Sequence, residues 1–297
     1  TFGIEFDSTS AGGISPVTYF TFCILMVIGA IIGLVLVVPP HQVIRADGKR
    51  VVYETAASPL EEFKNVLSLF TDKYMIMLTP LILQSNWFYT YDFGAINGQL
   101  FTSRTRGLNS SFYWGAQMIG AYLLGSLFLD TPRLSRRNRA IWGFIMCVTL
   151  NTLQWGWAFY IQFAWEGGGY DKDRPIEERI DFTDGGRYIL PAALYMYMGV
   201  CDSIIQTYAY WIMGAIANSP TVLARYAGYY KGIQSLGSAF SWIIDASGVM
   251  YRWQGIICFI LATIMVPPTY VVATWIKEHS DDEDIAGESS HSMETKE

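Results

Sequence analysis

The feature that most constrains this chain is a pair of long apolar segments separated only by a short break. Residues 188–247 are predominantly apolar, and Ser219-Pro220 interrupts them at a point too short to hold a domain. A helix needs about 20 apolar residues to cross a bilayer, so this stretch predicts two membrane helices. Each carries one ionisable residue, Asp202 and Lys231. A charge in lipid costs roughly 2.5–3.5 kcal/mol on insertion scales, so such residues usually face a protein interior or a wet cavity.

The composition of the whole chain agrees with a membrane protein. Of its 297 residues, 52% are hydrophobic and only 15% are charged, whereas average soluble domains carry about 25% charged residues. Long apolar runs in such a chain predict an all-α, polytopic membrane helix bundle. The chain begins at Thr1 without a signal-peptide pattern, so we expect it to be a fragment of a longer protein.

Charge and cysteine usage argue against several other classes. Residues 277–297 hold eight acidic residues, two lysines and no aromatic residue, and they account for the entire net charge of −6. Such a segment cannot bury a core, so we predict an acidic, disordered cytosolic tail. No basic stripe suggests nucleic acid. The four cysteines lie in apolar segments without a CxxC pattern, which predicts no disulfide, metal or cofactor.

No arrangement of residues indicates an enzyme. His41 lies in a polar connection, and His279 and His291 lie in the tail. The sequence contains no P-loop, HExxH, GxSxG or paired-carboxylate context. We therefore predict no catalytic residues.

Runs long enough to cross a bilayer occur seven times. Residues 1–16 are predicted to be extracytosolic, 17–38 to be the first span, 39–73 to be a cytosolic connector, and 74–276 to be a six-helix bundle. The spans of this bundle are predicted at Tyr74–Phe93, Asn109–Leu129, Ile141–Phe163, the two halves of 188–247, and Trp253–Ile276. Pro267-Pro268 lies inside the last span, where neighbouring helices can accommodate it.

The connector is predicted to contain a helix that lies along the membrane surface. Ser58-Pro59, with Glu61 and Glu62 in the first turn, is a typical helix start. Apolar residues then recur at helical spacing as far as Phe70. This pattern predicts an amphipathic surface helix.

Basic residues in short loops predict the orientation of the chain. The connector and the loop 131–139, with its four arginines, are rich in basic residues, whereas residues 1–15 have none. We place the connector, that loop and the tail in the cytosol. The polar loops 94–108 and 164–187 then lie outside.

Two polar stripes mark the candidate site. On the fifth span Tyr195, Asp202 and Gln206 fall near helical spacing on one face, and on the sixth Lys231 and Gln234 do likewise. Facing stripes of this kind predict either a solute or ion pathway or hydrogen-bond contacts that only hold helices together. Direct pairing of Asp202 with the shallower Lys231 is allowed but not required.

Two further patterns, a glycine pair on the sixth span and a polar pair on the second, bear on packing and on the candidate site. Gly228 and Gly232 form a GxxxG pattern, which predicts close helix packing. On the second span, Asn86 is a further pathway candidate, whereas Asp92 falls near the outer boundary, where we expect it to be solvated. The aromatic residues between them are typical of an interface belt.

Two stretches carry a family resemblance. NWFYTYDFGAINGQLFTSRTRGLNSSFYWGAQMIGAYLLG (Asn86–Gly125) resembles the signature region of fungal-type Unc-93-like proteins, and LARYAGYYKGIQSLGSAFSW (Leu223–Trp242) resembles a second region. The resemblance extends roughly from Leu60 to Lys277. Asp92 stands where relatives are expected to have Gln or another neutral polar residue.

The resemblance implies a major-facilitator fold, with two six-helix halves around a central cavity. Residues 17–38 then resemble the sixth helix, and the rest resembles the C-terminal half. Asp130, Arg136 and Arg137 are similar to that superfamily's cytosolic loop motif, which makes them gate candidates, although the spacing is imperfect.

Two functions are compatible with this resemblance. Many members of the family are presumed transporters, which predicts a small-solute carrier with Asp202, Gln206 and Gln234 in its cavity. Others are implicated as regulatory subunits of potassium channels or as trafficking partners of receptors, which predicts a non-transporting subunit. The expected partners are the bilayer, the missing N-terminal half, and, for the second function, another membrane protein. Fold resemblance does not decide between them.

Overall fold

The computed structural model describes residues 16–36, 58–166, 174–217 and 219–278. The predicted extracytosolic segment up to residue 15, most of the connector, and the acidic tail from residue 279 onward lie outside the described residues. Within these ranges the chain is helical apart from short turns and one isolated bridge between Phe101 and Ile180. The prediction of an all-α membrane helix bundle is therefore confirmed.

Helix starts follow the local sequence. In α2 (Pro59–Ser68), the Ser58 side chain accepts a hydrogen bond from the Glu61 amide, as predicted for this surface helix. In α3 (Lys73–Gln84), the Asp72 carboxylate accepts from the amides of Tyr74 and Met75. The helix axis turns by 84° between Pro59–Thr71, which contains α2, and α3. A bidentate ion pair between Glu62 and Arg225, at 2.8 Å, connects α2 to α8 (Pro220–Ala246).

Residues 94–108 were predicted to be a polar loop, but they are largely helical in the structure. Thr90–Asn97 (η3) is π-helical, α4 (Gly98–Leu100) continues it, and α5 (Ser103–Leu124) begins well before the expected position of the third span. Polar groups in this stretch pair with one another, since the Asn97 amide donates to the Arg106 carbonyl. These internal hydrogen bonds replace the water contacts that a loop would need.

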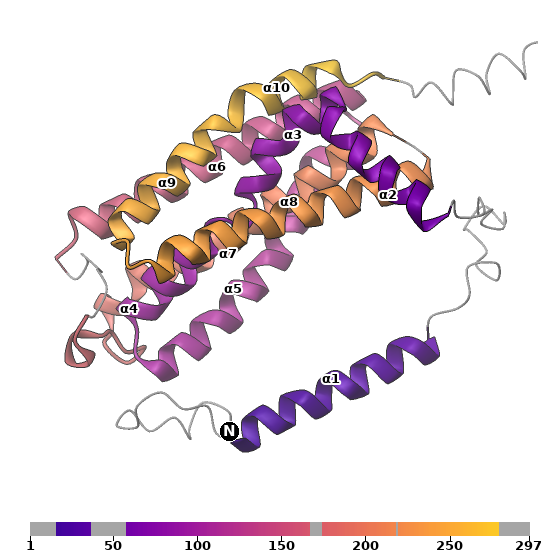
Figure 1. Ribbon diagram of the computed structural model, residues 1–297. Helices are drawn as coiled ribbons and strands as arrows, with labels where there is room; N and C mark the ends of the chain where they lie inside the picture. The colour runs from indigo at the N-terminus through magenta and orange to yellow at the C-terminus, as the bar shows by residue number, and fades with distance from the viewer. Residues whose placement is uncertain (1–15, 37–57, 167–173, 218, 279–297) are drawn as a thin grey trace, which may run out of the picture.

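The remaining helices agree closely with the predicted spans. They are α6 (Arg136–Phe163), α7 (Gly186–Ile216), α8 (Pro220–Ala246), α9 (Tyr251–Ile264) and α10 (Val266–Trp275). The helix is interrupted at Met265, just before the double proline, but α9 and α10 together form one continuous helical segment (Figure 1). Three helical segments of the described chain are long and apolar enough to cross a bilayer alone. The pair Pro59–Thr71 and Lys73–Gln84, bent by 84°, is either a broken fourth span or a re-entrant loop. The total of seven spans remains a prediction.

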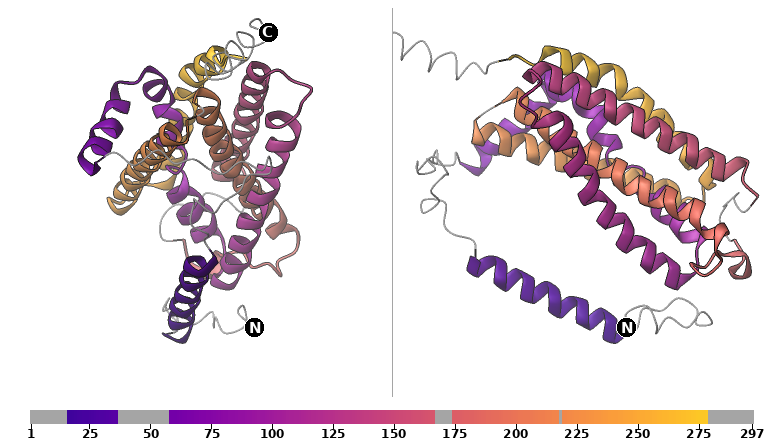
Figure 2. Two further views of the ribbon diagram at one scale, coloured as in Figure 1. Left: turned by 90° about the vertical axis from the view of Figure 1, so that its right-hand side faces the viewer. Right: turned by 180° about the vertical axis from the view of Figure 1, so that it is seen from behind.

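Helix α7 lies at the centre of the bundle. It packs against α5 and α6, while α8 packs against α3, and α10 covers α3 and α6 (Figures 1 and 2). Along α7, Tyr195 and Met198 belong to one buried apolar cluster, and Ile204 and Ile205 belong to another. Asp202 lies between the two clusters. Helix α1 (Pro16–Leu36) lies apart from the bundle in Figure 1 and in the right-hand view of Figure 2.

Candidate functional site

The site is built around the Asp202 carboxylate, which is 1% exposed. Its Oδ1 accepts a hydrogen bond from the Gln206 amide at 2.6 Å. Its Oδ2 accepts from Gln117 at 2.5 Å, from Tyr113 at 3.0 Å and from Tyr89 at 3.1 Å. A carboxylate has about four acceptor positions, and these four donors match that number.

Helix α8 joins this site through Gln234. The Gln234 amide nitrogen lies 3.3 Å from Gln206 Oε1 and 3.0 Å from Asn86 Oδ1. The Oε1 of Gln234 accepts a hydrogen bond from the Lys231 ammonium at 2.8 Å. Lys231 and Asp202 are therefore linked through two side-chain amides and do not pair directly. In the described residues, neither of them forms an ion pair.

The structure thus brings five of the six pathway candidates into one hydrogen-bonded network, which we call the acidic network: Asn86, Asp202, Gln206, Lys231 and Gln234, with Tyr89, Tyr113 and Gln117. Tyr195, the sixth candidate, packs its ring against that of Tyr113, with centroids 4.9 Å apart. Sequence reasoning missed Tyr113 and Gln117, although they are four residues apart and therefore on one face of α5.

Asp92 corrects a prediction. The sequence placed it near the outer boundary as a solvated residue, but the side chain is fully buried. Its Oδ2 lies 3.5 Å from the Tyr113 hydroxyl, and its Oδ1 has no hydrogen-bond partner among the described residues. The residue turns inward because η3 continues the buried helix through this region.

Two glycines determine how closely the helices of the site approach. A Cβ on Gly199 of α7 would meet the carbonyl oxygen of Tyr113, and one on Gly237 of α8 would meet the carbonyl oxygen of Leu83. These contacts bring Tyr113 under Asp202 and Gln234 beside Asn86. The predicted GxxxG pair behaves differently, because a Cβ on Gly228 or Gly232 meets no described atom within 4 Å. The prediction of close packing at that pair is wrong within the described part of the chain.

The gate candidates lie around the start of α6: Arg136 and Arg137 are its first two residues, and Asp130 precedes it. The Arg136 amide donates to Glu278 at 2.9 Å, and its guanidinium lies 3.4 Å from the Gly214 carbonyl at the end of α7. Arg136 therefore joins α6 to the end of α7 and to the residue beyond α10. Asp130 and Arg137 form no salt bridge in the described ranges. Their gate role stays a prediction.

A second acidic cluster holds the loop before α7 against the start of α5. Asp181 receives two hydrogen bonds of 2.7 Å from Arg104, and Thr102 and Thr183 also donate to it. The Arg104 guanidinium, together with these donors, holds the pKa of Asp181 well below its ordinary value. This contact could not be predicted from the sequence, because Arg104 and Asp181 are 77 residues apart.

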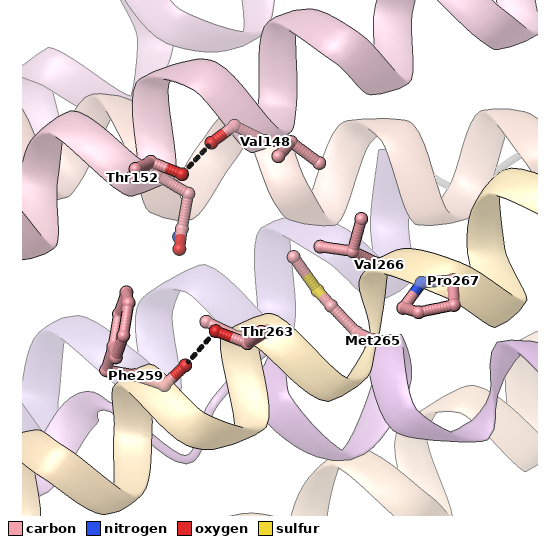
Figure 3. A pocket seen from close by; sticks show the side chains of 9 residues that line it. Val148, Thr152, Phe259, Thr263, Met265, Val266 and Pro267 are labelled. Atoms are coloured by element: carbon pink, nitrogen blue, oxygen red, sulfur yellow. Dashed lines mark hydrogen bonds between the residues drawn. The ribbon is translucent and has the colours of Figure 1, made fainter.

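A pocket of about 370 Å³ lies elsewhere, between α6 and α9–α10 (Figure 3). Its lining is mostly apolar, with Val148, Phe259 and Val266 among its residues. The hydroxyls of Thr152 and Thr263 donate to carbonyls of their own helices. The pocket therefore offers few polar groups to a solute, and the acidic network is the better candidate site.

These features define the class of the protein: a multi-pass membrane protein whose helical bundle encloses a network of acid and amide side chains. UNC93-like proteins 1 and 2 of Arabidopsis thaliana are each 34% identical to the chain over 95% of its length. An UNC93-like protein of Schizosaccharomyces pombe is 34% identical over 82% of it. The chain belongs to the UNC93-like family.

The matched regions cover only part of these relatives. The chain spans 60% of the length of the Arabidopsis proteins and 47% of the S. pombe protein. No protein-family model and no solved structure matches the chain.

Proposed function

We propose that the chain forms one half of a membrane carrier of major-facilitator type that moves a small polar solute. The observation that carries this proposal is the acidic network, which lies between two apolar clusters inside the bundle. A charge in a membrane interior is costly to keep, and such residues commonly mark a substrate or ion pathway. In this proposal Asp202, Gln206 and Gln234 contact the solute, and Arg136 contributes to a cytosolic gate.

The other half of the carrier is proposed to lie in a part of a longer protein that this chain does not span. The shared length of only 60% with the Arabidopsis relatives supports it. So do the exposed small residues of α5 and α8, because Gly107, Gly115, Gly228 and Gly232 all leave space for a neighbouring backbone. Small residues let membrane helices approach closely. Alternating access then has the two halves rock around the acidic network.

The test is solute uptake by the longer protein in liposomes, over a broad panel of amino acids, sugars, nucleosides and organic ions. We expect the wild type to take up at least one class of solute, and Asp202→Asn to abolish that uptake. Asp245→Asn is the matched control, since Asp245 accepts a hydrogen bond from Gln254 at 2.9 Å outside the acidic network. Uptake that survives Asp202→Asn at wild-type rate would contradict the proposed pathway.

A second candidate function is a subunit that binds another membrane protein and moves nothing. The open glycine faces of α5 and α8 favour it as much as they favour a second half, because both occupants would bring a helix to the same surface. The two functions differ in one measurable respect. A subunit of this kind would show no uptake in well-folded wild type, and Asp202→Asn would leave assembly with its partner intact.

A further inference from the structure

The second buried carboxylate, Asp92, has no evident means of carrying a negative charge. It forms no ion pair in the described part of the chain, and one of its oxygens lacks any hydrogen-bond partner there. Among the described residues, its one hydrogen-bond donor is the Tyr113 hydroxyl, at 3.5 Å. An unpaired buried carboxylate is so costly that the group normally takes up a proton instead.

Counting hydrogens around Tyr113 leads to the same result. The hydroxyl lies 3.0 Å from Asp202 Oδ2 and 3.5 Å from Asp92 Oδ2. A phenol has one hydrogen to donate and can also accept. The shorter distance assigns its hydrogen to Asp202, so a hydrogen between Tyr113 and Asp92 has to come from Asp92. A protonated Asp92 supplies it, and Asp202 then remains the charged member of the pair.

We propose that Asp92, Tyr113 and Asp202 form a proton relay in which the two carboxyl groups share a single proton. The distances to the Tyr113 hydroxyl place this proton on Asp92 in the resting arrangement of the relay. The relay deepens the proposed function, on which it rests only in assigning the proton as the coupling ion of the carrier. Asp92 lies in the π-helical segment Thr90–Asn97, and π-helical turns occur frequently at functional sites.

The transfer step needs no further reactant. The Asp92 O–H bond breaks as its proton moves to the Tyr113 oxygen, and the Tyr113 O–H bond breaks as its own proton moves to Asp202 Oδ2. Tyr113 ends as it began, Asp92 becomes charged and Asp202 becomes neutral. The Asp92–Tyr113 distance exceeds the usual 2.5–3.0 Å of an O–H···O bond, so this contact has to shorten before the proton can move.

The surroundings of Asp92 contain no group that would hold it charged. The titratable side chains that interact with it are those of Asp202, Tyr195 and Cys201 on α7, Tyr113 on α5, Cys258 on α9 and Tyr89 before η3. All of these are acids, and none gains a positive charge. The network's one cation, Lys231, donates to Gln234 at its other end.

Infrared difference spectroscopy of the purified protein, in water and in deuterated water at pH 7, tests the relay without any solute. We expect the C=O stretch of a protonated carboxyl group in wild type. The band should disappear in Asp92→Asn and remain in the control Asp245→Asn. In Tyr113→Phe it should persist at higher frequency, because the carboxyl loses its hydrogen-bond partner.

Two results would overturn the relay. One is a wild-type spectrum without this band, or a band that Asp92→Asn leaves in place. The other is a thermal stability that rises with NaCl or KCl, relative to choline chloride, in wild type but not in Asp92→Asn, because the pair would then hold a metal cation. Absence of solute uptake would refute the carrier but would leave the infrared band unchanged, so the two failures are distinguishable.

Discussion

The central position of Gly199 leads to a prediction with a definite sign. In Gly199→Ala the new Cβ would lie 3.1 Å from the carbonyl carbon and 3.2 Å from the Cα of Tyr113, and would press on the carbonyl oxygen between the helices. Ordinary carbon–carbon contacts are about 3.5–4.0 Å, so α5 and α7 have to separate by at least roughly 0.5 Å, and by more to relieve the contact with the oxygen. These atoms belong to backbone, so no side chain can turn away to make room.

Two opposing effects decide the magnitude. Overpacking a close contact costs about 1–3 kcal/mol, whereas alanine is favoured over glycine in a helix by about 1 kcal/mol. With an unyielding backbone the upper part of the first range applies, which leaves a net loss of about 1–2 kcal/mol. At about 2–4 °C per kcal/mol, the melting temperature should fall by roughly 2–8 °C.

Gly156→Ala is the matched control on α6, at a glycine outside the faces of α5 and α8 that are proposed to meet a neighbouring helix. Its Cβ meets no described atom within 4 Å, so only the helix preference acts, and the melting temperature should rise by about 2–4 °C. A thiol-reactive dye can follow unfolding in detergent, because Cys147, Cys201 and Cys258 are buried. The reasoning would be refuted if both variants became more stable by the same amount.

Two further predictions concern the cluster around Asp181 and the hydrogen bonds that Gln234 makes from α8. Because the pKa of Asp181 is lowered, its contribution to stability is fully present above the ordinary pKa of 3.8 and is lost as the pH falls below that value. The melting temperature of Asp181→Asn should therefore fall less between pH 5 and pH 3 than that of wild type, as measured by circular dichroism. Gln234→Leu removes the amide that donates to the buried hydroxyls of Ser85 and Tyr230. The loss should cost about 1–3 kcal/mol, seen as a lower melting temperature, whereas an unchanged melting temperature would mean that this amide contributes nothing.

The pairing of α7 with α8 could be predicted because both helices carry their polar residues at helical spacing. Asp202, Gln206 and Gln234 follow from that pattern alone. Tyr113, Gln117 and Asp92 could not be found in the same way, because their role depends on how α5 and η3 are rotated and how far η3 extends. Helix rotation is set by packing against several neighbours at once, which a single segment does not encode.

The glycines illustrate the same limit. The Gly228–Gly232 pattern indicates that a close approach is allowed, but in the described residues other glycines, among them Gly120, Gly199 and Gly237, approach a neighbouring backbone. A glycine permits contact on whichever face a partner reaches, and the partner of a given face is a property of the whole assembly. The exposed pair on α8 is therefore informative about what lies beyond the bundle.

The central claim is that the acidic network lines a path that water and solute can enter. The most direct measurement is the reaction of a small, charged thiol reagent with cysteines placed on α7 of the longer protein in intact liposomes. Gln206→Cys replaces a network residue, and Ile205→Cys is its neighbour in the apolar core, where the native side chain is 1% exposed. The account predicts that Gln206→Cys reacts and Ile205→Cys does not until the protein is denatured. Equal protection of both cysteines in the folded protein would contradict it.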